Sequence, residues 1–296
     1  MAKILITGGY GQLGTALSEV LENEDILLTD SDSMDITDKD QVKKVFNEYK
    51  PDWLVHGAAL TNVDGCEENP ELADKVNHLG TKILAEQCKK SGVKMIYIST
   101  DYIFDGAKGA PYLEDDKPNP QSAYGRTKLE GEKDARSIVG AYVLRTSWVY
   151  GQGHNFVGAM LKLADKTDGI KVVNDQFGRP TYALDLAKAI RDVIKKQPPL
   201  PVVPAPSAVI PAEAGIYNVT GDGEIISWAD FAKEIFELSG KDTKVTGIST
   251  EEYFKGNQDK KIAPRPAYSA LDLSKSKKAG LSLRDWKEAL AEYMAL

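Results

Sequence analysis

The 296-residue sequence contains little cysteine and histidine, more acidic than basic residues, and no long apolar run. Cys66 and Cys88 are too few for a disulfide scaffold or a zinc cluster, so we expect a protein of the reducing cytoplasm. A net charge of -7 argues against a nucleic-acid surface, which needs clustered cations. No stretch approaches the roughly 20 apolar residues of a membrane span, and the N-terminus lacks a signal-peptide core. We therefore expect no nucleic-acid partner and no membrane association.

A glycine-rich turn directly follows a short apolar run near the N-terminus. Residues 4–6 are typical of a buried parallel strand, and a helical stretch begins at Thr15. Between them, Gly9, Gly11 and Gly14 fit the dinucleotide fingerprint, whose glycines allow a tight turn, approach of a pyrophosphate and close helix packing. An ordinary tight turn is the alternative interpretation. The cofactor contacts expected here are Gly8, Gly11, Gln12, Leu13 and Gly14.

An acidic residue ends the second apolar run, about twenty residues after the glycine turn. Asp30 at this place would accept hydrogen bonds from the adenosine ribose hydroxyls and would repel a 2′-phosphate. We therefore expect NADH to be preferred over NADPH. The small residues Ala58 and Ala59, after a later strand, would let a cofactor lie close to the backbone. Further cofactor contacts are expected from Asp35 and Ile36.

Strands and helices alternate through the first half of the chain. Apolar runs predict strands over 4–6, 26–28, 53–56, 95–98 and 142–145, and helical patterns cover 38–49, 71–91 and 124–136. In the helix over 71–91 we expect a buried face of Leu72, Val76, Leu79, Ile83 and Leu84, with Gly92 as the C-cap. The alternation predicts an α/β fold: a Rossmann-like, doubly wound parallel sheet with right-handed crossovers.

The second half alternates less regularly. It predicts helices over 156–166, 184–195, 228–239 and 284–293, and strands over 170–173 and 216–219. We expect residues 1–150 to form an NAD(P)-binding Rossmann domain. Residues 151–296 would form a smaller α/β portion that binds mainly substrate, with about 170–195 returning to the Rossmann sheet. Six prolines in 197–213 predict an extended surface loop, either a passive insertion or a polyproline docking segment.

Three side chains suggest ketone chemistry. Tyr124 and Lys128 are four residues apart at the start of a predicted helix, so the phenol and the ammonium would lie on one face. A nearby ammonium would lower the phenol pKa from about 10 and make it a better acid–base group at neutral pH. Thr100 ends the fourth strand, at the sheet edge where ligands bind in such folds, and would orient a carbonyl oxygen.

Together these motifs resemble the extended short-chain dehydrogenase/reductase superfamily and, within it, the dTDP-4-dehydrorhamnose reductases. The two most specific runs are Ser-Thr-Asp-Tyr-Ile-Phe-Asp-Gly at 99–106 and Asn-Asp-Gln-Phe-Gly-Arg-Pro-Thr at 174–181. The other similar pieces are 8–14, 58–59 with 63–64, 124–128 with Glu130, 145–150, and 265–266 with Ser269. The resemblance covers nearly the whole chain.

The resemblance implies reduction of the 4-keto group of dTDP-4-dehydro-β-L-rhamnose to dTDP-L-rhamnose. Tyr124 would donate the proton, Lys128 would hold the cofactor ribose, and Thr100 would hold the substrate oxygen. The substrate contacts that the resemblance implies are Val63, Asp64, Thr100, Asp101, Phe104, Trp148, Asn155, Gln176, Arg179 and Arg265. Trp148 as a core aromatic and Arg179 as a solvated loop charge are the alternative interpretations.

Two residues depart from the family pattern. Some members are thought to dimerise around a magnesium ion held by glutamates, and here the corresponding places hold Ala16 and Ala183. Without carboxylates a hard cation has no ligands, so we expect no metal site and a monomer or a weak homodimer. Two other functions stay open. One is a non-catalytic dinucleotide-binding subunit like that of methionine adenosyltransferase, and the other is a reductase of another nucleotide-linked 4-keto deoxysugar.

Overall fold

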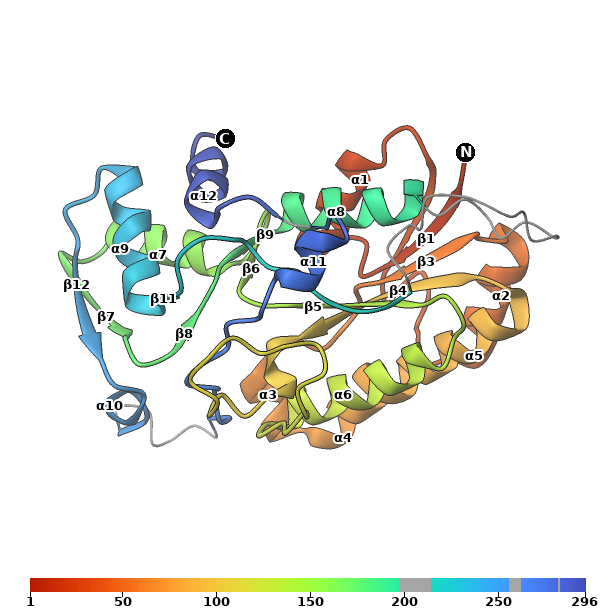
Figure 1. Cartoon of the computed structure of the whole chain (residues 1–296), viewed down its shortest axis with the longest axis horizontal. Coiled ribbons are helices and arrows are strands. Elements are labelled where there is room, and N and C mark those ends of the chain that lie inside the picture. Colours follow the sequence, from red (N-terminus) through yellow and green to blue (C-terminus); the bar gives the residue numbers. More distant parts are fainter. Residues whose placement is uncertain (197–213, 256–261, 282) are drawn as a thin grey trace.

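A six-stranded parallel sheet forms the centre of the computed structural model, which describes residues 1–196, 214–255, 262–281 and 283–296 (Figure 1). The strands run in the order β10-β5-β4-β3-β1-β2, and every neighbouring pair is parallel. Their bounds are β1 Lys3–Thr7, β2 Asp25–Thr29, β3 Trp53–His56, β4 Lys94–Thr100, β5 Tyr142–Thr146 and β10 Gly215–Asn218. The reversal of order at β1 confirms the doubly wound sheet.

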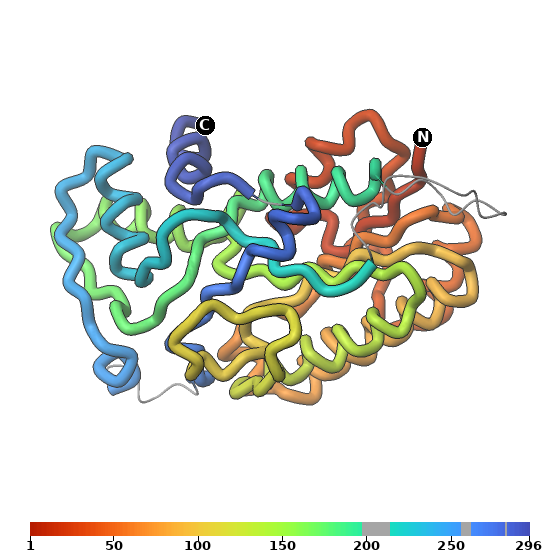
Figure 2. The backbone as a smooth tube through the Cα atoms, viewed as in Figure 1, coloured from red at the N-terminus to blue at the C-terminus, as the bar shows by residue number. Residues whose placement is uncertain are grey.

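Helices cover both faces of this sheet, as the tube trace shows (Figure 2). On one face α1 (Gln12–Val20) and α8 (Ala183–Lys196) pack together over Ile4 and Ile6. The other face carries α2 (Lys39–Tyr49), α5 (Thr81–Ser91) and α6 (Ala123–Arg136). Leu5 points to this second face, because successive side chains of a strand alternate. Strands buried on both faces need the continuous apolar runs that the sequence contains.

The helix predicted over 71–91 is not one regular helix. After α3 (Val63–Glu68) come α4 (Pro70–Ala73), a π-helical segment η1 (Asp74–Gly80) and then α5. A π turn is wider than an α turn, so the spacing of three and four residues does not keep one face buried. The expectation was therefore wrong for two positions: Leu72 is 43% and Leu79 42% exposed. Gly92, with φ of 68°, is confirmed as the C-cap.

A smaller portion lies beside the sheet (Figure 1). It has its own aromatic core around Tyr150, Phe231 and Trp286. Three short strand pairs build it: β6 (Val149–Tyr150) with β9 (Thr181–Tyr182), β7 (Gly169–Val173) with β12 (Lys244–Ile248), and β8 (Phe177–Gly178) with β11 (Ile226–Ser227). Its helices are α7 (Phe156–Ala164), α9 (Trp228–Ser239), α10 (Thr250–Lys255) and α12 (Trp286–Met294), and α11 (Ser274–Lys278) lies against β10.

The expected return of residues 170–195 to the sheet needs a correction. Helix α8 does pack on the central sheet, but strand β7 pairs with β12 instead. The sixth strand is β10, which comes later in the chain. The expectation for 197–213 lies outside the described residues, and the domain division at residue 150 stays a prediction. Within the part of the chain described, no helix has the length and hydropathy needed to cross a membrane.

Candidate active site

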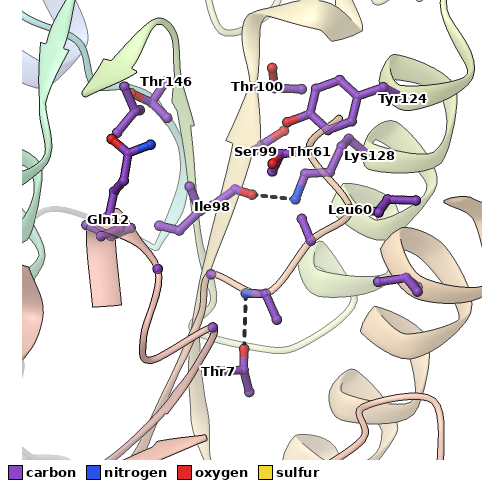
Figure 3. Close-up of a pocket in the computed structure, with 18 of the residues that line it drawn as sticks. Thr7, Gln12, Leu60, Thr61, Ile98, Ser99, Thr100, Tyr124, Lys128 and Thr146 are labelled. Carbon is purple, nitrogen blue, oxygen red and sulfur yellow. Dashed lines mark hydrogen bonds between the residues drawn. The ribbon is translucent and has the colours of Figure 1, made fainter. Parts of the chain in front are cut away.

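A cavity of about 910 Å³ lies at the C-terminal ends of strands β1 to β5 (Figure 3). Thr7 and Thr29 close the first two strands, and Thr100 and Thr146 close β4 and β5; all four line the cavity. This is the edge of an open α/β sheet at which ligands bind. The cavity extends from Asp30 past the start of α1 to the face of α6.

The glycine turn brings the start of α1 close to the sheet. Gly8 takes the left-handed conformation, with φ of 70°, and a Cβ there would lie 2.8 Å from the Ala58 amide nitrogen. A Cβ on Gly14 would collide with the carbonyl oxygens of Gly8 and Gly9. Gly11 is the N-cap of α1, and no side chain of the described residues caps the amides at this N-terminus. Free amides and the helix dipole suit a diphosphate, so the donor set fits a dinucleotide.

Asp30 lies at the far end of the cavity and is held in a tight turn. Its Oδ1 accepts hydrogen bonds from the Ser33 hydroxyl at 2.7 Å and from the amides of Ser33 and Asp32. The Ser33 hydrogen bonds hold the pKa of Asp30 below its usual value, so the carboxylate is ionised at neutral pH. A fixed anion here suits ribose hydroxyls. Asp35, Ile36, Ala58 and Ala59 line the same cavity.

Thr100, Tyr124 and Lys128 meet at the other end (Figure 3). Gly125 allows this close packing, because a Cβ on it would collide with the Tyr102 carbonyl oxygen and push α6 away from the turn that follows β4. The Lys128 ammonium donates a 2.7 Å hydrogen bond to the Ile98 carbonyl oxygen and lies 4.2 Å from the centre of the Tyr97 ring. The structure therefore brings together the three side chains that the sequence grouped.

The electrostatics of this trio differ from the expectation in one respect. Burial raises the pKa of the Tyr124 phenol well above 10, and Thr100, rather than Lys128, lowers it as a hydrogen-bond partner. Burial lowers the pKa of Lys128 to about 7. The expected lowering of the phenol pKa by Lys128 is therefore not seen, because the ammonium is desolvated and bound to Ile98.

A buried ion pair fixes α6 against the sheet, and the motifs did not reveal it. Glu132, one turn after Lys128, and Arg145 of β5 are each 1% exposed. Arg145 donates to both carboxylate oxygens, at 2.6 and 3.1 Å, and Ser99 of β4 donates to Glu132 at 2.8 Å. The helix that carries Tyr124 is thus joined to β4 and β5 by charge-assisted hydrogen bonds.

The expected substrate contacts separate into two groups. Val63, Asp101 and Trp148 line the cavity with Thr100. Trp148 has a strained φ of 49° and stacks on Trp228 with ring centres 3.7 Å apart, so it belongs to the cavity wall and to the aromatic core at once.

The remaining six make contacts elsewhere. Arg265 pairs with Asp64, and its Nη2 lies 2.9 Å from Oδ2. The Arg179 guanidinium donates to the carbonyl oxygens of Gly223 and Leu271. Three others have partners outside the cavity lining: Asn155 caps α7, Gln176 donates to Thr250, and Phe104 stacks on Tyr112. None of these six side chains lines the cavity in the part of the chain described.

Several cavity residues were missed. Thr146 ends β5 and Ser147 follows it directly, so the strand-end rule was sufficient to find them. Gln152, Gly153 and His154 lie in a loop that carries no motif. Ala16 and Ala183 are both buried in the core. Among the described residues no cluster of three His, Cys, Asp or Glu side chains can hold a metal ion.

Comparison with known proteins shows similarity over the full chain. Residues 2–296 match the family model described as RmlD substrate binding domain. The spore coat polysaccharide biosynthesis protein SpsK of Bacillus subtilis (strain 168) is 39% identical over 298 residues, which cover 99% of this chain and 97% of that protein.

Two solved structures share the fold of this chain over nearly the whole length of both proteins. A dTDP-4-dehydrorhamnose reductase from Clostridium acetobutylicum ATCC 824 is 42% identical with a TM-score of 0.89, covering 99% of this chain and 98% of the other. The dTDP-4-dehydrorhamnose reductase of Bacillus anthracis str. Ames in complex with NADP is 34% identical with a TM-score of 0.88, covering 100% and 99%. The chain is thus similar to two reductases, one of them solved with a nicotinamide dinucleotide.

Proposed function

The chain belongs to the RmlD substrate-binding-domain family, and from this premise we propose that it reduces the 4-keto group of dTDP-4-dehydro-β-L-rhamnose with NADH or NADPH. One observation carries the proposal: the cavity joins a dinucleotide-type glycine turn to Thr100, Tyr124 and Lys128. The dTDP-4-dehydrorhamnose reductases among its relatives support the substrate, and the NADP complex supports the cofactor class.

The reaction needs a hydride at C4 and a proton at the ketone oxygen. A bound NAD(P)H supplies the hydride. Tyr124 donates the proton, and its high pKa keeps the phenol protonated until the ketone oxygen gains negative charge. Lys128 holds the cofactor ribose, and Thr100 donates a hydrogen bond to the ketone oxygen.

One end of the cavity would bind the cofactor and the other would bind the sugar of the substrate. The amides of Gly11 to Leu13 would hold the diphosphate of the cofactor, and Asp30 would accept from its adenosine ribose, which favours NADH. Val63, Asp101 and Trp148 would contact the sugar. We place the nucleotide of the substrate toward residues 151–296, in keeping with the expected domain division.

We also propose that the protein acts in the cytoplasm as a monomer or a weak homodimer. Both cysteines are free and buried, as suits a reducing compartment. Alanines replace the carboxylates that a magnesium-linked dimer would need at positions 16 and 183. Sedimentation of the purified protein with and without magnesium tests this, and a metal-dependent dimer would contradict it.

The test of the proposed function is loss of nicotinamide absorbance when the protein receives enzymatically generated dTDP-4-dehydro-β-L-rhamnose, with NADH and NADPH in parallel. We expect turnover, faster with NADH at limiting cofactor. Cofactor binding without turnover of this sugar would contradict the proposal. Turnover of another 4-keto sugar, or capture of a synthetase partner, would then decide between the two alternatives.

A further inference from the structure

Asp101 is an acidic side chain in the cavity to which the proposed reaction gives no role in catalysis. It begins the single turn η2 (Asp101–Ile103) directly after β4, and it is only 2% exposed. Its Oδ1 lies 3.0 Å from the Thr100 hydroxyl oxygen. Its Oδ2 makes no hydrogen bond of normal geometry with the described residues, although the Ser269 hydroxyl lies near enough to lower the pKa. A buried carboxyl with so few partners requires an explanation.

The hydroxyl of Thr100 has a single proton, and the protonation state of Asp101 determines which group accepts the hydrogen bond from it. Thr100 Oγ1 already accepts a hydrogen bond from the Tyr102 amide at 3.2 Å and is a hydrogen-bond partner of Tyr124. An ionised Asp101 can only accept hydrogen bonds, so the Thr100 hydroxyl donates its hydrogen bond to Oδ1. No hydroxyl proton is then left for the ketone oxygen of a substrate.

The charge of Asp101 acts in the same direction. An ionised Asp101 raises the pKa of the Tyr124 phenol by Coulomb repulsion, and thereby opposes the phenolate that forms when Tyr124 donates its proton. A protonated Asp101 removes this repulsion. Both effects therefore favour reduction by the enzyme in which Asp101 is an acid.

The surroundings of Asp101 allow the acid form at neutral pH. Burial raises its pKa to about 7, and the opposing contributions come from the Ser269 and Thr100 hydroxyls and from backbone amides. Among the described residues, Asp101 raises the pKa values of the Tyr102 and Tyr124 phenols. Beyond Tyr102 lies the ion pair of Arg265 with Asp64, which act on the Tyr102 phenol with opposite signs.

We propose that Asp101 is a positioning residue that acts through Thr100. Its acid form donates a hydrogen bond to Thr100, which leaves the Thr100 hydroxyl free to donate to the ketone oxygen. Its ionised form instead accepts the hydrogen bond of the Thr100 hydroxyl. This inference rests on the proposed ketone reduction and extends it. It makes Asp101 a determinant of the pH range of the reaction, in addition to the contact with the sugar that the family resemblance implies.

Asp101→Asn tests the proposal, because the amide is isosteric and can donate to Thr100 at every pH. The measurement is the single-turnover rate of cofactor oxidation at saturating cofactor and substrate, from about pH 5.5 to about pH 9. The rate of the variant divided by that of the wild type cancels any titration common to both, including that of Lys128. We expect this ratio to be constant in acid and to rise roughly tenfold for each pH unit above the Asp101 pKa of about 7.

Two outcomes of this measurement overturn the proposal. A ratio that does not change with pH means that Asp101 does not control the rate by titration. A ratio that falls as pH rises means that the carboxylate itself is needed, as for a ligand of a sugar hydroxyl. In a Thr100→Val background we expect the rise to shrink to the part that comes from the charge of Asp101 on Tyr124, and an undiminished rise would show that Asp101 does not act through Thr100.

A titration without substrate separates this inference from the proposed function. Carbon-13 NMR of protein labelled at the aspartate carboxyl carbons follows each carboxyl, and comparison with Asp101→Asn assigns the signal. We expect Asp101 to titrate near neutral pH, and a carboxyl ionised throughout would overturn the inference. Failure of the wild type to reduce the sugar would instead overturn the proposed function and leave this titration readable.

Discussion

In the proposed reduction, Tyr124 would provide the proton. Replacing it with phenylalanine removes one hydroxyl from a partly buried ring and leaves the amides that would face the cofactor unchanged. For Tyr124→Phe we expect turnover to fall by about two to four orders of magnitude, as for loss of a general acid, with an unchanged Kd for the reduced cofactor. Stopped-flow rates and cofactor fluorescence measure the two quantities. Near-normal turnover would remove Tyr124 as the proton donor.

Asp30 is the residue on which the preference for NADH rests. Its carboxylate is ionised and fixed by Ser33, so it would accept from ribose hydroxyls and repel an added phosphate. Asp30→Ala should therefore weaken NADH binding more than NADPH binding, measured as the two Kd values. Asp32→Ala, two residues later and outside the cavity lining, is the matched control. Equal losses for both cofactors would contradict the preference.

Helix α6 depends on close packing at Gly125. A Cβ there has no room beside the Tyr102 carbonyl oxygen, which is backbone and cannot rotate away. We expect Gly125→Ala to lower the free energy of unfolding by about 1 to 3 kcal/mol and to reduce turnover, because Tyr124 moves with the helix. Gly158→Ala in α7, where the nearest atom is 3.9 Å away, is the control and should be neutral or slightly stabilising. Urea unfolding of both variants decides this.

The same helix is joined to the sheet by the pair of Glu132 with Arg145. Breaking a buried ion pair leaves one uncompensated charge, so Glu132→Gln should destabilise the protein by about 3 to 5 kcal/mol. Glu130 lies two residues before Glu132 and forms an exposed ion pair with Lys133. Glu130→Gln removes that pair and should change stability by less than about 1 kcal/mol. A Glu132→Gln variant as stable as wild type would show that Arg145 finds other partners.

At the scale of the whole molecule, the free energy of unfolding should depend on pH because two buried side chains of the cavity, Lys128 and Asp101, have shifted pKa values. The folded protein holds the pKa of Lys128 at about 7, against an ordinary value of 10.5. Between these values the unfolded chain binds more protons, so the free energy of unfolding rises with pH over this range. Asp101 acts oppositely: its pKa is raised from 3.8 to about 7, so its contribution to stability falls as pH rises between those values.

Lys128→Met should therefore abolish the rise in stability above pH 7 and make the protein more stable than wild type in mild acid. Urea unfolding at several pH values measures this, with Lys133→Met, an exposed lysine of the same helix, as the control. A wild type whose stability does not rise between neutral pH and about pH 10 would contradict the lowered pKa.

The sequence by itself determined the alternation of strands and helices that forms the doubly wound sheet, the glycine turn and the grouping of Thr100 with Tyr124 and Lys128. These follow from local rules: apolar period, turn chemistry, helical spacing and the position of strand ends in a parallel sheet. Only the tertiary structure decided which contacts the charged side chains make. Arg179 and Arg265 bind partners far along the chain, and the desolvation that raises the Asp101 pKa comes from several elements at once. Such effects depend on three-dimensional burial, which no local pattern encodes.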